Sequence, residues 1–157
     1  MITVVQVLAV LALAANAVVY GTDAAAALVV RSANTHLDDT AMTLSAGWGH
    51  YYADRRMPPV GITGLLSMLA AAVAAALGGH TVAAAAAGVS VIALIAWLVL
   101  YARIAKPVNI AQKAAALSGN IPANARALQQ RWDSIIGVRV GLQAIALLAA
   151  AVTIAAV

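Results

Sequence analysis

The chain has 157 residues, of which 64% are hydrophobic and 9% are charged, with a formal net charge of +4 at pH 7. Soluble domains carry about 25% charged residues, so this composition excludes a conventional soluble enzyme and a disordered chain. There is no cysteine, which excludes disulfides and thiol chemistry, and basic residues between long apolar runs indicate membrane orientation rather than nucleic-acid binding. We expect one all-α integral membrane domain, in contact with the lipid bilayer.

The first apolar segment, about residues 2–31, is long enough to cross a bilayer. Residues 2–30 contain one charged side chain, Asp23, and no Lys or Arg precedes Arg31. A cleaved signal peptide would begin with a positively charged region. We therefore interpret the segment as the first of four membrane spans.

The next segment, 32–58, is rich in charged and aromatic side chains, and we expect a short cytoplasmic-side helix in it, between spans 1 and 2. His50 and Asp54 are four residues apart, which places them on one helical face, and His36 and Asp39 repeat the pair at a spacing of three. Such side chains at one membrane level are typical of a copper, iron or zinc site. The alternative is an interfacial helix with His50 at the lipid headgroups and Asp54 paired with a neighbouring arginine.

Residues 57–102 carry no Asp, Glu, Lys or Arg. As one helix this run would be about 69 Å long, roughly twice the hydrocarbon core of a bilayer. It must therefore form two spans, about 59–77 and 82–101, joined at Gly78-Gly79-His80. A polar segment 102–133 follows, and the fourth span covers about 134–157.

The distribution of basic residues predicts the orientation of this four-helix bundle. Eight of the nine Lys and Arg residues lie in 31–56 and 102–133, which a four-span topology places on one side of the membrane. The positive-inside rule makes that side cytoplasmic. We expect a plasma (bacterial inner) membrane protein with both termini on the extracytoplasmic side.

The ninth basic residue, Arg139, lies inside the fourth span, as Asp23 lies inside the first. Each is eight residues from the charged boundary, which is about 12 Å along a helix. Ionisable groups in a membrane are costly and mark functional sites with a partner, so we expect the two side chains to be in contact. They form either a structural ion pair or a proton acceptor with its counter-ion, whereas uncharged polar residues such as Ser90 and Gln143 are expected to bridge helices.

Several short motifs, in their order along the chain, resemble one protein family. They are Gly21-Thr22-Asp23, His50-x-Tyr52-x-Asp54-Arg55-Arg56-Met57-Pro58, Tyr101-x-Arg103, Pro107-Val108-Asn109, and Arg131-Trp132-Asp133 followed by Arg139. Together they resemble the small four-span membrane proteins grouped with anthrone oxygenases, over about residues 16–143. The resemblance implies oxidation by O2 of a hydrophobic, hydroxylated aromatic molecule, anthrone- or quinol-like, that reaches the site from the bilayer.

The resemblance also suggests roles for individual residues. His50 would be the catalytic base, with Asp54 orienting it and Asp23 nearby, and Arg139 would stabilise an enolate oxygen. The substrate ring would contact four further residues, Trp97, Tyr101, Asn109 and Trp132. Copper or iron bound by His36, Asp39, His50 and Asp54 is one route to oxygen activation, and cofactor-independent oxygenation is the other. The rival interpretation is a non-enzymatic membrane subunit or partner-binding protein in which Asp23–Arg139 is a structural ion pair. Association into a homo-oligomer is compatible with either interpretation.

Overall fold

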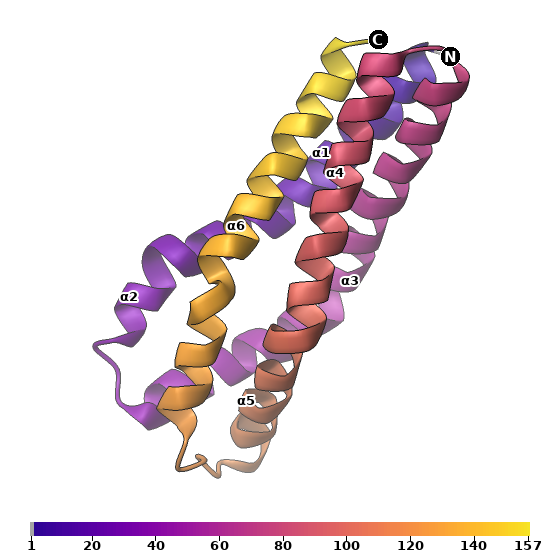
Figure 1. Cartoon of the computed structure of the whole chain (residues 1–157). Coiled ribbons are helices and arrows are strands. Elements are labelled where there is room, and N and C mark those ends of the chain that lie inside the picture. The colour runs from indigo at the N-terminus through magenta and orange to yellow at the C-terminus, as the bar shows by residue number, and fades with distance from the viewer. Residues whose placement is uncertain (1) are drawn as a thin grey trace.

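The computed structural model describes residues 2–157, and the described chain is all-helical (Figure 1). Four helical rods are long and apolar enough to cross a membrane, which confirms the predicted four-helix membrane bundle. The elements in chain order are α1 (Ile2–Ala25), the π-helical turn η1 (Ala26–Val30), α2 (Arg31–Asn34), α3 (Asp39–Leu77), α4 (Thr81–Leu100), the π-helical turn η2 (Tyr101–Ala105), α5 (Lys106–Ser118) and α6 (Ala125–Ala155).

The rods form a closed ring in which the first (α1, η1 and α2) contacts α3 and α6, and α4 contacts both α3 and α6. Both chain termini lie at one end of the bundle, and the connections 35–38 and 119–124 lie at the other (Figure 1). We call these the terminal end and the loop end. The basic segments 31–56 and 102–133 therefore belong to the loop end.

The short helix predicted between spans 1 and 2 is present as the first part of α3, and it is continuous with span 2. α3 runs without a break from Asp39 to Leu77, through Pro58 and Pro59. Its start is fixed by Asp38, whose carboxylate accepts a hydrogen bond of 2.7 Å from the Ala41 N–H, as N-cap residues do. Prolines are tolerated inside membrane helices where neighbouring groups compensate for the lost backbone bonds.

The helices continue beyond the predicted spans at the loop end. α6 begins at Ala125, before the predicted span 134–157, and α5 covers residues 106–118 of the expected polar segment 102–133. Charged residues mark where a helix leaves hydrocarbon, but a helix continues into water as long as its backbone hydrogen bonds are kept. The four rods therefore extend past the predicted spans at the loop end.

The core of the terminal half is built mainly from alanine. One buried cluster combines Ala9, Ala12, Met68, Ala71, Ala87 and Ala150, and a second combines Val5, Ala75 and Ala83. Small residues let membrane helices approach closely. Gly64 shows how closely, because a β-carbon there would collide with the Asn16 side chain of α1.

Candidate functional site

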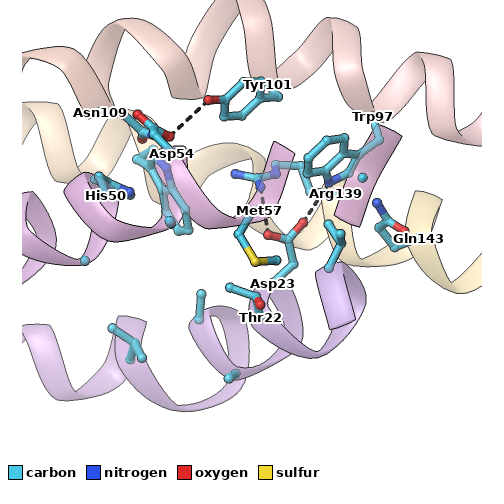
Figure 2. A pocket seen from close by; sticks show the side chains of 18 of the residues that line it. Thr22, Asp23, His50, Asp54, Met57, Trp97, Tyr101, Asn109, Arg139 and Gln143 are labelled. Atoms are coloured by element: carbon cyan, nitrogen blue, oxygen red, sulfur yellow. Dashed lines mark hydrogen bonds and ion pairs between the residues drawn. The ribbon is translucent and has the colours of Figure 1, made fainter. Parts of the chain in front are cut away.

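A cavity of about 710 Å³ opens between the rods in the loop-end half of the bundle. Its wall combines residues from every rod, so that segments distant in sequence share one space (Figure 2). All the residues expected from sequence to be catalytic or to contact the substrate line it. These are Asp23, His50, Asp54, Trp97, Tyr101, Asn109, Trp132 and Arg139.

A buried ion pair between α1 and α6 lines the cavity. The Arg139 Nη2 atom lies 2.7 Å from Asp23 Oδ1, and the indole N–H of Trp97 donates to Asp23 Oδ2 at 2.7 Å (Figure 2). Asp23 is 3% exposed and Arg139 is 6% exposed, so the pair is screened from water. The predicted contact between these two side chains is confirmed.

Aromatic rings surround this ion pair. The Arg139 guanidinium carbon lies 5.0 Å from the ring centre of Trp97 and 5.3 Å from that of Trp132, within cation–π range. Trp97 is stacked on Tyr101, with ring centres 5.7 Å apart and planes within 4°. The His50 ring lies 5.8 Å from that of Trp132. The cavity therefore has flat aromatic walls beside a buried cation.

A second polar cluster is centred on Asp54 of α3. Its carboxylate accepts hydrogen bonds from the Tyr101 hydroxyl at 3.1 Å and the Asn109 amide at 3.3 Å, and it forms an ion pair with Lys113 of α5. Among the described residues no hydrogen bond joins Asp54 to His50. Asp54 is instead bonded to Tyr101, Asn109 and Lys113, and its role in orienting His50 stays a prediction.

The alternative in which Asp54 pairs with a neighbouring arginine is wrong. Arg55 lies over the Tyr51 ring at 3.4 Å from its centre, and Arg56 lies over the Tyr52 ring at 4.9 Å. On a helix each residue is a neighbour of the one four positions away, so both arginines are held by aromatic rings of their own helix.

The predicted set of four metal ligands does not come together. Asp39 forms an ion pair with Arg126 at 2.7 Å, and His36 is exposed in the turn before α3. Asp39 and His50 are eleven positions apart on the same helix, which separates them by about 16 Å along its axis. Within residues 2–157, no three side chains of His, Cys, Asp or Glu converge as a metal site would require.

Polar atoms without partners are concentrated in the wall of this cavity. The described chain has seven buried side-chain nitrogen or oxygen atoms with no hydrogen-bond partner, and such atoms are costly. Five belong to residues that line the cavity, namely Asn16 Nδ2, Asn109 Oδ1, Trp132 Nε1, Arg139 Nε and Gln143 Oε1. These atoms are themselves covered by neighbouring side chains, so a bound molecule with hydroxyl or carbonyl groups would supply the missing partners after a local movement of those side chains.

Sequence reasoning missed two members of the site. Lys113, which neutralises Asp54, follows Asn109 by four residues, a spacing that places both on one face of α5. Met57 lines the cavity, although from sequence it stood out only as part of the motif that begins at His50. The i, i+4 relation of Asn109 and Lys113 is the signal that would have identified the lysine.

No protein-family model, no curated protein and no solved structure matches the chain. What the site can do therefore follows from its own chemistry. It offers an imidazole, a buried arginine with a free N–H, flat aromatic walls and apolar surroundings. These groups suit the binding of a planar, weakly acidic aromatic molecule.

Proposed function

We propose that this protein is a membrane oxidoreductase that binds a hydrophobic, hydroxylated aromatic molecule in the cavity and oxidises it with O2, as the resemblance to anthrone oxygenases implies. The observation that carries the proposal is the set of unpartnered polar atoms between apolar and aromatic walls. A hydrocarbon chain at the level of Arg139 and Trp132 would leave their unpartnered N–H groups unsatisfied, whereas phenolic and carbonyl oxygens would satisfy them.

Binding would use the aromatic walls and two free N–H groups. Rings of a polycyclic substrate would stack on Trp97 or Trp132. Its oxygen would accept hydrogen bonds from Arg139 Nε and Trp132 Nε1, neither of which has a partner within residues 2–157. Asp23 balances the charge of Arg139, so the cavity has no excess positive charge. A substrate oxygen that gains negative charge during the reaction would be stabilised by the N–H group of Arg139, which is already held in position.

The chemical step we propose begins with proton transfer to His50. Its imidazole takes a proton from the methylene carbon of an anthrone, and the negative charge moves onto the enolate oxygen beside Arg139. The carbanion carbon forms a C–O bond with O2, and the resulting peroxide takes up the proton from His50. Loss of the second hydrogen of that carbon, with cleavage of the O–O bond, releases water and forms the second carbonyl. The balance is anthrone plus O2 giving anthraquinone plus water.

Copper or iron does not fit the residues present. Asp54 is already bonded to Tyr101, Asn109 and Lys113, and Asp39 is bonded to Arg126. Among the described residues, His50 is the one histidine that lines the cavity. The proposed steps therefore use the side chains alone.

The test is oxidation of a hydroxylated anthrone by purified protein, followed by O2 consumption and quinone absorbance. His50→Gln keeps a polar side chain but cannot act as the base, and we expect a rate loss of about 100-fold, within the usual range for general bases. His36→Gln, in the exposed turn outside the cavity, is the matched control and should keep the parental rate. Full activity of His50→Gln would remove the base from the mechanism, and absence of oxidation by the parent protein would favour a non-enzymatic membrane subunit.

We also propose that the loop end faces the cytoplasm of a plasma membrane, with both termini outside. Eight of the nine Lys and Arg residues belong to loop-end segments, as the positive-inside rule requires of a cytoplasmic side. A reporter enzyme fused after Val157 should be active only outside the cytoplasm. Cytoplasmic activity of that fusion would reverse the orientation.

A further inference from the structure

The cavity is much longer than a compact aromatic molecule. Its lining on α3 follows one helical face from Ser45 to Leu65, and on the first rod it extends from Asn16 to Asn34. At 1.5 Å per residue these stripes are roughly 30 Å and 27 Å long. Three fused rings are about as long as two helical turns, roughly 11 Å, so such a ring system would occupy less than half of this length.

The chemistry of the wall changes along this length. The middle holds Asp23, Arg139 and the aromatic rings, whereas the part toward the terminal end is lined by Val19, Ile62 and Leu65. We call that part the apolar arm; it also includes Gly61 and Leu94, and two uncharged amide side chains, Asn16 and Gln143, lie in its wall. The part toward the loop end is polar, with Asn34, Ser45, Gln129 and Asp133.

The cavity opens sideways between the first rod and α3. Thr22 and Ala25 on one side, and Pro58 and Ile62 on the other, both line the cavity and are exposed on the outer surface. Thr22 and Ile62 fall within the expected spans 2–31 and 59–77. A molecule in the apolar arm therefore has a path to the hydrocarbon of the bilayer.

We propose that the natural ligand is a phenol or quinol that carries an isoprenoid or alkyl chain, with its ring in the middle of the cavity and its chain in the apolar arm. This inference rests on the proposed function, since it names the substrate class of that site. The ring oxygens meet the unpartnered N–H groups of Arg139 and Trp132. The chain fills an arm whose described lining has no charged side chain and continues into lipid.

A phospholipid is a poorer occupant of the same space. Its phosphate would sit at the polar loop end, near Arg31, and its acyl chains would then pass the middle of the cavity. Acyl chains have no hydrogen-bonding groups, so Arg139 Nε and Trp132 Nε1 would stay without partners, which is costly for buried donors. A phenol hydroxyl at that level removes this cost.

The test compares two probes, hydroquinone and geranylhydroquinone, which share a ring and differ in the chain. Binding is measured by tryptophan fluorescence of protein in phosphatidylcholine nanodiscs. The protein carries the substitution Trp48→Phe, so that the remaining fluorescence comes from Trp97 and Trp132 in the cavity wall. Gly61→Leu fills the apolar arm, because a β-carbon at Gly61 meets nothing within 4 Å. Gly88→Leu is the matched control, since Gly88 is equally open and does not line the cavity.

We expect Gly61→Leu to weaken binding of geranylhydroquinone roughly tenfold more than binding of hydroquinone, because it displaces buried methylene groups of the chain. Gly88→Leu should weaken neither probe. Both proteins are measured in the same lipid, so partition of the chain into the bilayer cancels. Equal effects of Gly61→Leu on the two probes, or a retained phospholipid that geranylhydroquinone does not displace in native mass spectra, would overturn the inference.

Oxygen consumption separates this inference from the proposed function. Discrimination between the probes without any O2 consumption would support the ligand class and overturn the oxidation. Oxidation of anthrone without discrimination between the probes would support the oxidation and overturn the ligand class.

Discussion

The same four rods form both halves of the bundle, but they pack tightly in one half and enclose a cavity in the other. In the terminal half, alanines and Gly64 bring the helix backbones together, and the buried clusters contain no charged side chain. In the loop-end half, Trp97, Trp132 and Arg139 occupy the space between the rods, and a cavity of about 710 Å³ remains. Side-chain size alone therefore decides where the rods pack tightly and where they separate.

The comparison also explains why the charged groups are in the open half. Without water or a hydrophobic driving force between helices, membrane helices associate through packing and hydrogen bonds. The terminal half relies on packing. The open half has lost much of that packing, and we infer that the ion pairs Asp23–Arg139, Asp54–Lys113 and Asp39–Arg126 hold the rods around the cavity instead.

The largest expected effect comes from breaking the buried pair of the open half. Arg139→Met leaves Asp23 buried with no opposite charge, and removing one partner of a buried pair typically costs about 3–5 kcal/mol. We expect a loss of that size in the free energy of unfolding, measured by dodecyl sulfate titration of protein in mixed micelles.

The control for this change is the double variant Asp23→Asn, Arg139→Met. The new amide side chain at position 23 would keep an oxygen acceptor for the Trp97 indole N–H, which donates to Asp23 in the parent chain. The unpaired charge is gone, so most of the lost stability should return. If the single variant is as stable as the parent, the ion pair does not hold the open half together.

The second prediction applies one substitution to both halves. Met68 is fully buried in the tight alanine cluster, whereas Met57 lines the cavity. Met68→Ala should leave a void that closely packed helices cannot fill, at a cost of about 2 kcal/mol. Met57→Ala should cost less than about 1 kcal/mol, because its side chain already lacks neighbours on one side. Equal losses in the same unfolding titration would mean that the two halves are packed alike.

The tight half and the broad fold were the parts most accessible from sequence. Charge-free runs predicted four spans, and the matched depths of Asp23 and Arg139 predicted their contact, because a helix converts residue number into distance along its axis. Both follow from the cost of charge in hydrocarbon, which acts on each residue separately.

The partners within the open half were less predictable. His36, Asp39, His50 and Asp54 are close in sequence, yet the last three lie at different heights along the single helix α3. The partner of Asp54 proved to be Lys113, which is distant in sequence and reaches it only because α5 packs against α3. Short spacings within one segment therefore predicted contacts between residues that are neighbours in sequence, whereas the structure pairs these residues with side chains of other helices.

The smallest expected effect lies in the tight half, at a hydrogen bond between α4 and α6. The Ser90 hydroxyl is buried and donates to the Ala146 carbonyl at 2.9 Å. Ser90→Ala should lower the free energy of unfolding by about 0.6 kcal/mol, the average for such bonds between membrane helices. The loss stays small because the Ala146 carbonyl is a helix acceptor inside α6 and is not left without a partner.

Ser67→Ala is the matched control for this last change, since the Ser67 hydroxyl has no hydrogen bond within the described chain. Removal of this hydroxyl should change the free energy of unfolding by less than about 0.5 kcal/mol. Binding of the aromatic probes should be the same in both variants, because neither serine lines the cavity. A loss above about 2 kcal/mol for Ser90→Ala would mean that the tight half depends on this polar bridge as strongly as on its packed alanines. The contrast between a half held by packing and a half held by charge would then not describe the bundle.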